Sequence, residues 1–247
     1  MPQLYDEIGV GYRHARRPDP RIAAAIWRAL GSAESVVNVG AGAGSYEPSD
    51  RYVVAVEPAT TMIRQRRRGS APAVQASATD LPFRTGSFAA ALAVLTVHHW
   101  PDRERGFREL ARVARDSVVI LTWDPASPGF WLADDYFPEL TEIDRRIFPT
   151  IEEFRRALGD IVVSPLPVPH DCMDGFTGAY WRRPHAYLDV NVRNAMSTFA
   201  KLHQVDAALL RLRCDLDDGT WERRHGDLLG RPELDLGYRL VVSTRRS

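Results

Sequence analysis

The feature that most constrains this chain is an apolar stretch that runs directly into three alternating glycines. Residues 35–39 read SVVNV and are followed by GAGAG at residues 40–44. β-Branched residues favour a buried strand, and glycines allow a tight turn in which a ligand approaches the backbone without meeting a side chain. A second apolar stretch, residues 52–56, ends at Glu57, whose carboxylate can accept hydrogen bonds from both hydroxyls of a ribose. Together the two stretches predict a site for a nucleoside-like ligand.

The composition excludes several other classes of protein. The 247 residues include 32 basic and 32 acidic side chains, so no net charge is available to hold a polyanion, and we expect no nucleic-acid partner. The longest mostly apolar run, residues 88–97, is about half of the ~20 residues needed to cross a bilayer, so we expect no membrane partner. The chain has two cysteines, Cys172 and Cys214, and begins without a basic region followed by an apolar run. These features favour the reducing cytoplasm.

Strand-like and helix-like stretches alternate along the first half of the chain. Helical spacing of apolar residues is found at residues 21–30, 60–68 and 103–114, and short apolar runs typical of strands at 73–76, 88–95 and 117–122. This alternation predicts an α/β fold with a doubly wound, Rossmann-like, mostly parallel sheet and helices on both faces. Residues 161–168 and 234–243 would add strands at the far edge of the sheet.

The spacing of the glycines distinguishes between two kinds of nucleotide site. The dinucleotide fingerprint GxGxxG, read from Gly40, requires a third glycine where Ser45 stands, so a dehydrogenase is the less favoured interpretation. Gly44 instead completes the pattern GxGxG. This pattern, after an apolar strand and before the acidic strand end at Glu57, resembles the cofactor loop of class I S-adenosylmethionine-dependent methyltransferases.

Further stretches resemble the methyltransferase type 11 family, in the family's own order. ASATDLPF at residues 76–83 with GSF at 86–88 resembles its DAxxLPF…GSFD stretch, and LTVHHWPD at 95–102 with FRELARV at 107–113 resembles its fourth strand and following helix. Tyr12 and the pair Arg17 and Pro18 resemble an N-terminal element of the family. The resemblance covers about residues 5–123. It implies a methyltransferase with S-adenosyl-L-methionine as cofactor.

The resemblance also implies roles for individual residues. The backbone of the three glycines would hold the methionine moiety, Glu57 the ribose, Ser77 and Ala78 the adenine, and the Leu95 carbonyl the amino group. Arg17 would pair with the methionine carboxylate. The cofactor-binding residues implied in this way are Tyr12, Arg17, Asn38, Gly40, Gly42, Gly44, Glu57, Ser77, Ala78 and Leu95.

Three positions depart from the pattern of the family, one of them Ala89, which stands where the family commonly has an aspartate after the phenylalanine of strand four. Asn38 stands where the family has an acidic residue that faces the amino group of the cofactor, and Ser77 stands where it has an adenine-contacting aspartate. An amide accepts a hydrogen bond but offers no charge to an ammonium group. These departures leave open an alternative function, a nucleoside-binding protein without transferase activity.

Methyl transfer from a sulfonium is an in-line displacement, so the main task of such an enzyme is to hold the reacting atoms in line and exclude water. His98 follows the fourth strand, and we predict that it points toward the methyl group and acts as the base when the acceptor must lose a proton. His99 would face elsewhere. The alternative is that His98 lines the pocket or caps structure without chemistry.

The remaining stretches predict a lid over the site. Residues 124–150 and 169–231 are rich in aromatic side chains, and we expect a helical cap inserted after strands five and six. The alternative is that these residues only pack helices over the sheet. Residues 1–123 would be the cofactor-binding part, and residues 151–168 and 232–247 a returning helix and edge strands of the same domain. An aromatic wall suits a planar or cationic small-molecule acceptor of the methyl group.

One segment of the expected cap contains several side chains of the kind that bind metals. His170, Cys172 and Asp174 lie close together in the sequence but do not complete a ligand set at a known spacing. We therefore predict no metal site.

Overall fold

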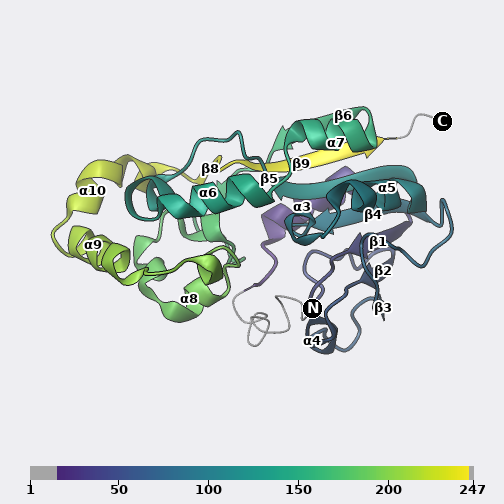
Figure 1. The fold of residues 1–247 in the computed structure, drawn as a ribbon, viewed down its shortest axis with the longest axis horizontal. Coiled ribbons are helices and arrows are strands. Elements are labelled where there is room, and N and C mark those ends of the chain that lie inside the picture. The colour runs from purple at the N-terminus through teal and green to yellow at the C-terminus, as the bar shows by residue number, and fades with distance from the viewer. Residues whose placement is uncertain (1–15, 245–247) are drawn as a thin grey trace.

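The computed structural model describes residues 16–244 and contains a seven-stranded sheet with the strand order β3-β2-β1-β4-β5-β9-β6 (Figure 1). The strands are β1 (Ser35–Val39), β2 (Tyr52–Val56), β3 (Ala73–Val74), β4 (Phe88–Val94), β5 (Ala114–Trp123), β6 (Ile161–Pro165) and β9 (Tyr238–Thr244). Strands β1 to β5 pair in parallel, and β9 pairs antiparallel with both β5 and β6. Strands β7 (Val168–Pro169) and β8 (Glu233–Leu234) form a separate pair. The expected doubly wound, mostly parallel sheet is confirmed.

Helices cover both faces of this sheet. They are α3 (Pro20–Leu30), α4 (Thr60–Arg64), α5 (Arg103–Val113), α6 (Pro138–Ile147), α7 (Ile151–Leu158), α8 (Val190–Asn194), α9 (Asp206–Asp217) and α10 (Thr220–His225). Shorter helical turns lie at Val97–His99, Leu132–Tyr136, Thr177–Tyr180, Pro184–Leu188, Phe199–Lys201 and Gly226–Gly230. Because side chains alternate along a strand, Val36 packs in the core under α3 while its neighbour Val37 packs in the core that contains residues of α5 and α7.

Polar side chains at the first turns fix where three of the helices begin. The side chains of Asp19 and Asp102 accept hydrogen bonds from the backbone at the starts of α3 and α5. Thr150 and Glu153 form a reciprocal capping box at the start of α7. The helix expected over residues 60–68 ends earlier, at Arg64, and the strand expected over residues 73–76 is limited to Ala73–Val74.

The strand order places a crevice between the carboxyl ends of β1 and β4. The chain passes from β1 to β2 on one side, whereas β4 joins β1 on its other side, so the connections leave these two neighbouring strands in opposite directions. Open α/β sheets bind their ligands at such a switch point. The glycine-rich residues 40–44 follow β1 directly and therefore lie at this position.

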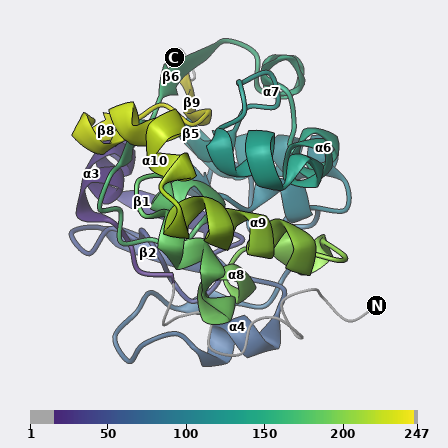
Figure 2. The same ribbon diagram turned by 90° about the vertical axis from the view of Figure 1, so that its left-hand side faces the viewer.

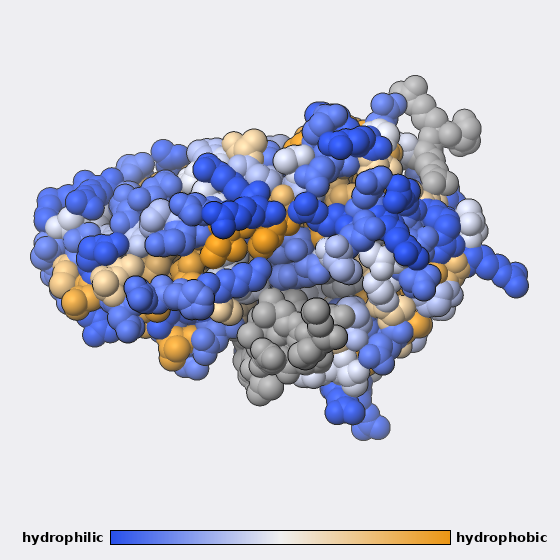
Figure 3. All heavy atoms as spheres, viewed as in Figure 1, coloured by the Kyte–Doolittle hydropathy of each residue, from blue (hydrophilic) through white to orange (hydrophobic). Residues whose placement is uncertain are grey.

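The remaining helices form a lobe beyond the end of the sheet. Figure 1 shows α8, α9 and α10 to the left of the sheet, and Figure 2, which looks at this lobe, shows them in front of it. The lobe and α6 share a core of their own, which includes Trp131, Tyr136, Phe137, Leu140, Tyr187, Phe199, Leu212 and Trp221. On the face shown in Figure 3, hydrophilic side chains predominate, with smaller groups of hydrophobic ones, some of them on this lobe. Within residues 16–244 we find no helix with the length and apolar character needed to cross a membrane.

Candidate active site

A cavity of about 470 Å³ lies at the switch point. This volume is in the range of pockets that hold ligands of nucleoside size. Seven of the residues predicted from the sequence line it, namely Asn38, Gly40, Gly42, Glu57, Ser77, Ala78 and Leu95. Asn38 belongs to β1 itself, and the others come from the loops that follow β1, β2, β3 and β4. The fold thus brings together side chains that are spread over almost 60 positions of the sequence (from 38 to 95).

The glycines at this site allow close packing and leave few free backbone donors. The N–H groups of Gly40 and Ala41 both donate to the carbonyl of Val56, at 2.8 and 3.0 Å. Gly40 has a φ of +71°, and a Cβ atom added there would lie 2.0 Å from Oγ1 of Thr96, at the end of β4. Our expectation that the ligand approaches these N–H groups is therefore wrong for Gly40 and Ala41, because β2 already uses them. Their role is to let β1 and β4 approach each other closely.

Glu57 connects the glycine loop to the end of β2. Its carboxylate accepts hydrogen bonds from the N–H groups of Gly42 at 2.8 Å and Ala59 at 2.9 Å, and its side chain is largely buried. A carboxylate has more acceptor positions than two donors fill. Glu57 therefore holds the loop in place and can still accept hydrogen bonds from a ligand in the cavity.

Asn38 is held so that its amide oxygen lacks a partner. Its Nδ2 donates to Oε1 of Glu47 at 3.2 Å, and its buried Oδ1 accepts no hydrogen bond within residues 16–244. Glu47 in turn forms a buried ion pair with Arg66 at 2.7 Å, and Arg66 also donates to the carbonyls of Gly42 and Ala71. Because a buried polar oxygen without a partner is costly, Oδ1 of Asn38 fits a ligand that brings its own donor, such as an ammonium group.

The loops after β3 and β4 complete the wall of the cavity. Ser77 Oγ lies 2.8 Å from Oγ1 of Thr79 and accepts a hydrogen bond from the Thr79 N–H, which turns the chain sharply here. Leu95 has a φ of +48°, a strained conformation for a leucine, and it lies exactly where the chain leaves β4. Gly44, the third glycine, is not among the residues that line the cavity; it packs against Arg66.

The arginine that lines the cavity near the N-terminus is not the one predicted from the sequence. Tyr12 lies outside the described residues. Arg17 is exposed and is not among the residues that line the cavity, whereas Arg16 lines it. The reason is that Arg16 forms a bridge with Asp174 in an extended segment, where neighbouring side chains point in opposite directions. An inward Arg16 therefore leaves Arg17 pointing outward.

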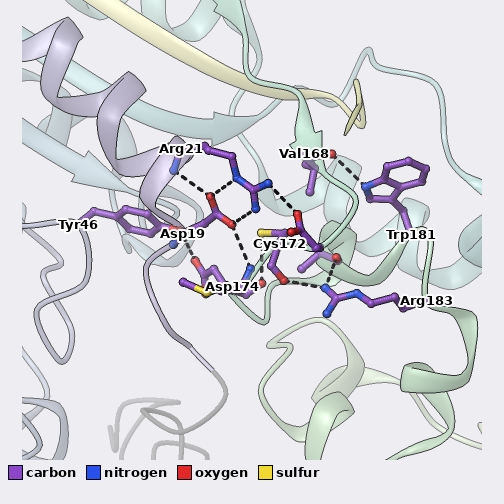
Figure 4. A network of polar contacts seen from close by, with 11 residues as sticks. Asp19, Arg21, Tyr46, Val168, Cys172, Asp174, Trp181 and Arg183 are labelled. Atoms are coloured by element: carbon purple, nitrogen blue, oxygen red, sulfur yellow. Dashed lines mark hydrogen bonds and ion pairs between the residues drawn. The ribbon is translucent and has the colours of Figure 1, made fainter. Parts of the chain in front are cut away.

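Arg16 belongs to a buried polar network that joins three distant segments. Its guanidinium pairs with the carboxylate of Asp174, which also accepts a hydrogen bond from the hydroxyl of Tyr46 at 2.7 Å. Asp19 lies beside them and accepts a hydrogen bond from the N–H of Met173 at 3.1 Å (Figure 4). Tyr46 also lines the cavity. The network therefore links the cofactor loop, the start of α3 and residues 171–174.

A smaller cavity of about 70 Å³ adjoins the first one and shares Arg16 and Leu95 with it. Its wall combines residues at the ends of β4 and β5 with residues of α6 and the helical lobe. Side chains with aromatic rings make up much of it, namely His98, Trp123, Phe130, Phe148, Phe176 and Tyr238. Some of the aromatic residues of residues 124–231 thus line a pocket, while others form the core of the lobe.

The two neighbouring histidines line different cavities. His98 faces the smaller one, where its ring stacks on Phe148 with centroids 4.0 Å apart, and His99 lines the larger one. The expectation that His99 faces away from the site is wrong, because the helical turn of residues 97–99 directs both rings inward. Burial lowers the pKa of His98 well below its usual value and that of His99 to about 3. Both rings are neutral at physiological pH.

We expect the free energy of unfolding to fall as the pH is lowered below 6.5, because the unfolded chain then takes up protons that the folded histidines do not. The contribution of His98 approaches about 1.4 kcal/mol per pH unit. Urea unfolding of the protein and of His98→Asn, at about pH 7.5 and about pH 5.5, checks this. The stability of the variant should depend less steeply on pH, and equal pH dependence of the two proteins would contradict the assignment.

The segment of residues 170–174 uses its polar groups for other contacts. The carboxylate of Asp174 is bound by Arg16 and Tyr46, and Cys172 is buried. Across the part of the chain that the structure describes, no three His, Cys, Asp or Glu side chains are grouped in a way that could hold a metal ion.

Several residues of the site were given no role in it from the sequence. Arg16, Tyr46, Thr96 and His99 line the larger cavity, and Asp144 lines the smaller one. Tyr46 reaches the site through a left-handed backbone, with a φ of +64°, and its partner Asp174 is 128 positions away. The one sequence signal for Tyr46 is that it is an aromatic residue close behind the glycines.

Comparison with known proteins agrees with this geometry. Residues 37–122 match the family described as a methyltransferase domain. A crystal structure of a protein assigned as a methyltransferase of an antibiotic biosynthesis pathway, from Anabaena variabilis, is 33% identical, covers 94% of this chain and 99% of that one, and superposes with a TM-score of 0.86.

Curated relatives match over shorter stretches. A chloroplastic 2-methyl-6-phytyl-1,4-hydroquinone methyltransferase from Oryza sativa subsp. japonica is 33% identical over 33% of this chain. A tRNA (carboxymethyluridine(34)-5-O)-methyltransferase from Mus musculus is 30% identical over 49% of it. The matches span about a fifth of these relatives, 22% and 19% of their lengths. With the full-length structural match and the site at the switch point, the chain belongs to the class I S-adenosylmethionine-dependent methyltransferases.

Proposed function

We propose that this enzyme methylates a small molecule that binds in the smaller cavity. The observation that carries the proposal is the pair of adjoining cavities that share Arg16 and Leu95, one of cofactor size and one walled by aromatic side chains. A concave wall with aromatic side chains and a few polar groups is typical of sites for small ligands. The zero net charge of the chain further favours a small molecule over tRNA, the substrate in the name of one relative.

The residues of the larger cavity suit the cofactor of the family, which supplies an electrophilic methyl group when bound. We assign the ribose to Glu57, the adenine to Ser77 and Ala78, and the amino group to Asn38 Oδ1 and the Leu95 carbonyl. The methionine carboxylate is assigned to Arg16 in place of Arg17, because Arg16 lines the cavity. With these assignments, the methyl group would be presented toward Leu95 and Arg16, which the two cavities share.

The chain itself then has two tasks in the transfer. It must align the acceptor atom with the methyl group and exclude water, and the cap formed by residues 124–150 and 169–231 serves both purposes. His98 lines the acceptor cavity, and its ring is neutral because burial lowers its pKa. A neutral imidazole does not repel the cationic cofactor beside it. Because the lowered pKa makes it a weak base, it would take a proton only from an acceptor that becomes strongly acidic as it gains the methyl group, such as a hydroxyl. We assign this proton-accepting role to His98.

Transfer of label from the cofactor tests the proposal. The enzyme is incubated with S-adenosylmethionine carrying a labelled methyl group and with cell extract divided into small-molecule, RNA and protein fractions. We expect label in the small-molecule fraction. Label in RNA or protein would overturn the proposed substrate class.

The two free cysteines, one of them exposed, support a reducing compartment such as the cytoplasm as the place of this reaction.

A further inference from the structure

The smaller cavity contains a carboxyl group that the proposed transfer does not use. Asp144 lies on α6, one turn before Phe148, and both side chains line the cavity. Phe148 is the residue that stacks on His98 at the end of β4. Asp144 therefore lines the same cavity as His98, one helical turn from the ring that stacks on that histidine.

The contacts of Asp144 leave part of its carboxylate available. Oδ1 accepts a hydrogen bond from the hydroxyl of Thr198 at 2.7 Å, and Thr198 is almost completely buried. Within residues 16–244, Oδ2 accepts no hydrogen bond and Asp144 forms no ion pair within 4.0 Å; Lys201 is the nearby cation. Burial raises the pKa of Asp144 to about 6, against an ordinary value of 3.8. Thr198 thus fixes one oxygen, and the other has no hydrogen-bond partner among the described residues in a side chain that lines the cavity.

The rest of the cavity wall indicates what this oxygen would meet. Arg16, the cation in the wall, is paired with Asp174, and the proposed function assigns its remaining donors to the methionine carboxylate. The other side chains of the wall are uncharged and include aromatic rings, such as Trp123 and Phe176, and hydroxyl groups, such as that of Thr141. A carboxylate in such a wall favours a ligand that donates a hydrogen bond and disfavours an anion.

We propose that Asp144, oriented by Thr198, binds an N–H or O–H group of the methyl acceptor, while the aromatic side chains of the wall contact its apolar body. This inference rests on the proposed function, because it assumes that the smaller cavity holds the acceptor. It makes Asp144 a specificity-determining residue that selects an amine or a hydroxyl compound and rejects a carboxylate.

Three probes with the same aromatic body test the proposal: phenethylamine, phenethyl alcohol and hydrocinnamate. Their binding to the enzyme loaded with S-adenosylhomocysteine is measured by calorimetry at about pH 7.5. We expect the amine or the alcohol to bind at least about tenfold more tightly than the anionic hydrocinnamate. Tighter binding of the amine would identify an amine acceptor, and tighter binding of the alcohol a hydroxyl acceptor.

Asp144→Asn removes the charge but preserves the volume and the acceptor for Thr198. We expect the favoured probe to bind at least about tenfold more weakly to this variant and hydrocinnamate to bind more tightly. Glu142→Gln, which changes an exposed carboxylate on the same helix, is the matched control and should bind all three probes as the unchanged enzyme does. The unfolding temperature of Asp144→Asn should not fall, because a neutral amide is easier to bury than a carboxylate.

Three results would overturn the role of Asp144. In the first, hydrocinnamate binds to the unchanged enzyme as tightly as the other probes do. In the second, each probe binds equally tightly to Asp144→Asn and to the unchanged enzyme. In the third, none of the probes binds. Failure of the proposed function is recognised separately, because it would appear as a lack of S-adenosylmethionine binding or as label in RNA or protein. Asp144→Asn should keep its affinity for S-adenosylmethionine, since Asp144 does not line the cofactor cavity.

Discussion

Asp174→Ala is expected to lower the free energy of unfolding by about 3–5 kcal/mol, the usual effect of removing one partner of a buried ion pair. The side chain of Asp174 is 1% exposed, and its carboxylate binds both the guanidinium of Arg16 and the hydroxyl of Tyr46. The variant leaves a charge and a hydroxyl without their partner in a place that water reaches poorly. Because Arg16 and Tyr46 line the cofactor cavity, affinity for S-adenosylmethionine should fall as well.

Asp171 provides the matched control for this variant. It lies in the same loop and pairs with Arg21 at 2.7 Å, but its side chain is 57% exposed. Asp171→Ala should therefore change neither stability nor cofactor affinity appreciably, because water and salt screen an exposed pair. Urea unfolding and calorimetry on both variants measure the two effects. Equal stability of the two variants would show that the network does not stabilise the fold.

Gly40→Ala is expected to lower stability by about 2–5 kcal/mol, the sum of a left-handed backbone at a residue with a side chain, about 1–2 kcal/mol, and of overpacking, about 1–3 kcal/mol. The added Cβ would lie 2.0 Å from Oγ1 of Thr96 and 2.8 Å from its Cβ. Both residues line the cofactor cavity, so relief of the clash must distort its wall. We expect the affinity for S-adenosylmethionine to fall by at least about 100-fold, equivalent to about 3 kcal/mol.

Gly69→Ala separates the two contributions. Gly69 also has a positive φ, +85°, but a Cβ there would meet nothing within 4 Å, and it does not line the cavity. This control should show only the backbone cost, with unchanged cofactor affinity, in the same unfolding and calorimetry measurements. The double variant Gly40→Ala with Thr96→Ala should regain part of the lost affinity. Identical behaviour of the two single glycine variants would rule out the steric role of Gly40.

The sequence is most informative where local patterns determine structure. The β-branched and apolar runs of β1, β2 and β4 predicted buried strands, and the glycines after β1 predicted the turn between them. The helix over residues 60–68 was predicted too long. The helical periodicity of the sequence continues past Arg64, where the helix ends. The side chain of Arg66 forms an ion pair with Glu47, and no local pattern predicts this contact.

In the site, too, local sequence patterns determine the positions of some residues, and contacts with distant residues determine those of others. Glu57 could be located from its place at a strand end, and it lines the cavity. Which of the two neighbouring arginines faces inward is decided by Asp174, 158 positions from Arg16. The orientation of Asp144 likewise depends on Thr198, which lies 54 positions away. Contacts at such separations arise only when the chain folds, so the sequence alone gave the cofactor site better than the acceptor site.

The position of β9 bears on the order in which the two halves of the active site can form. It pairs with both β5 and β6, although it follows them by more than 70 positions, and it carries Tyr238 into the wall of the acceptor cavity. The strands that carry the cofactor loops, β1, β2 and β4, are all synthesised before residue 100 and pair with one another without β9. During translation, therefore, the strands that carry the glycine loop can assemble early, whereas Arg16 gains its partner Asp174 later, and the proposed acceptor pocket gains its last wall only when β9 enters the gap between two strands already made.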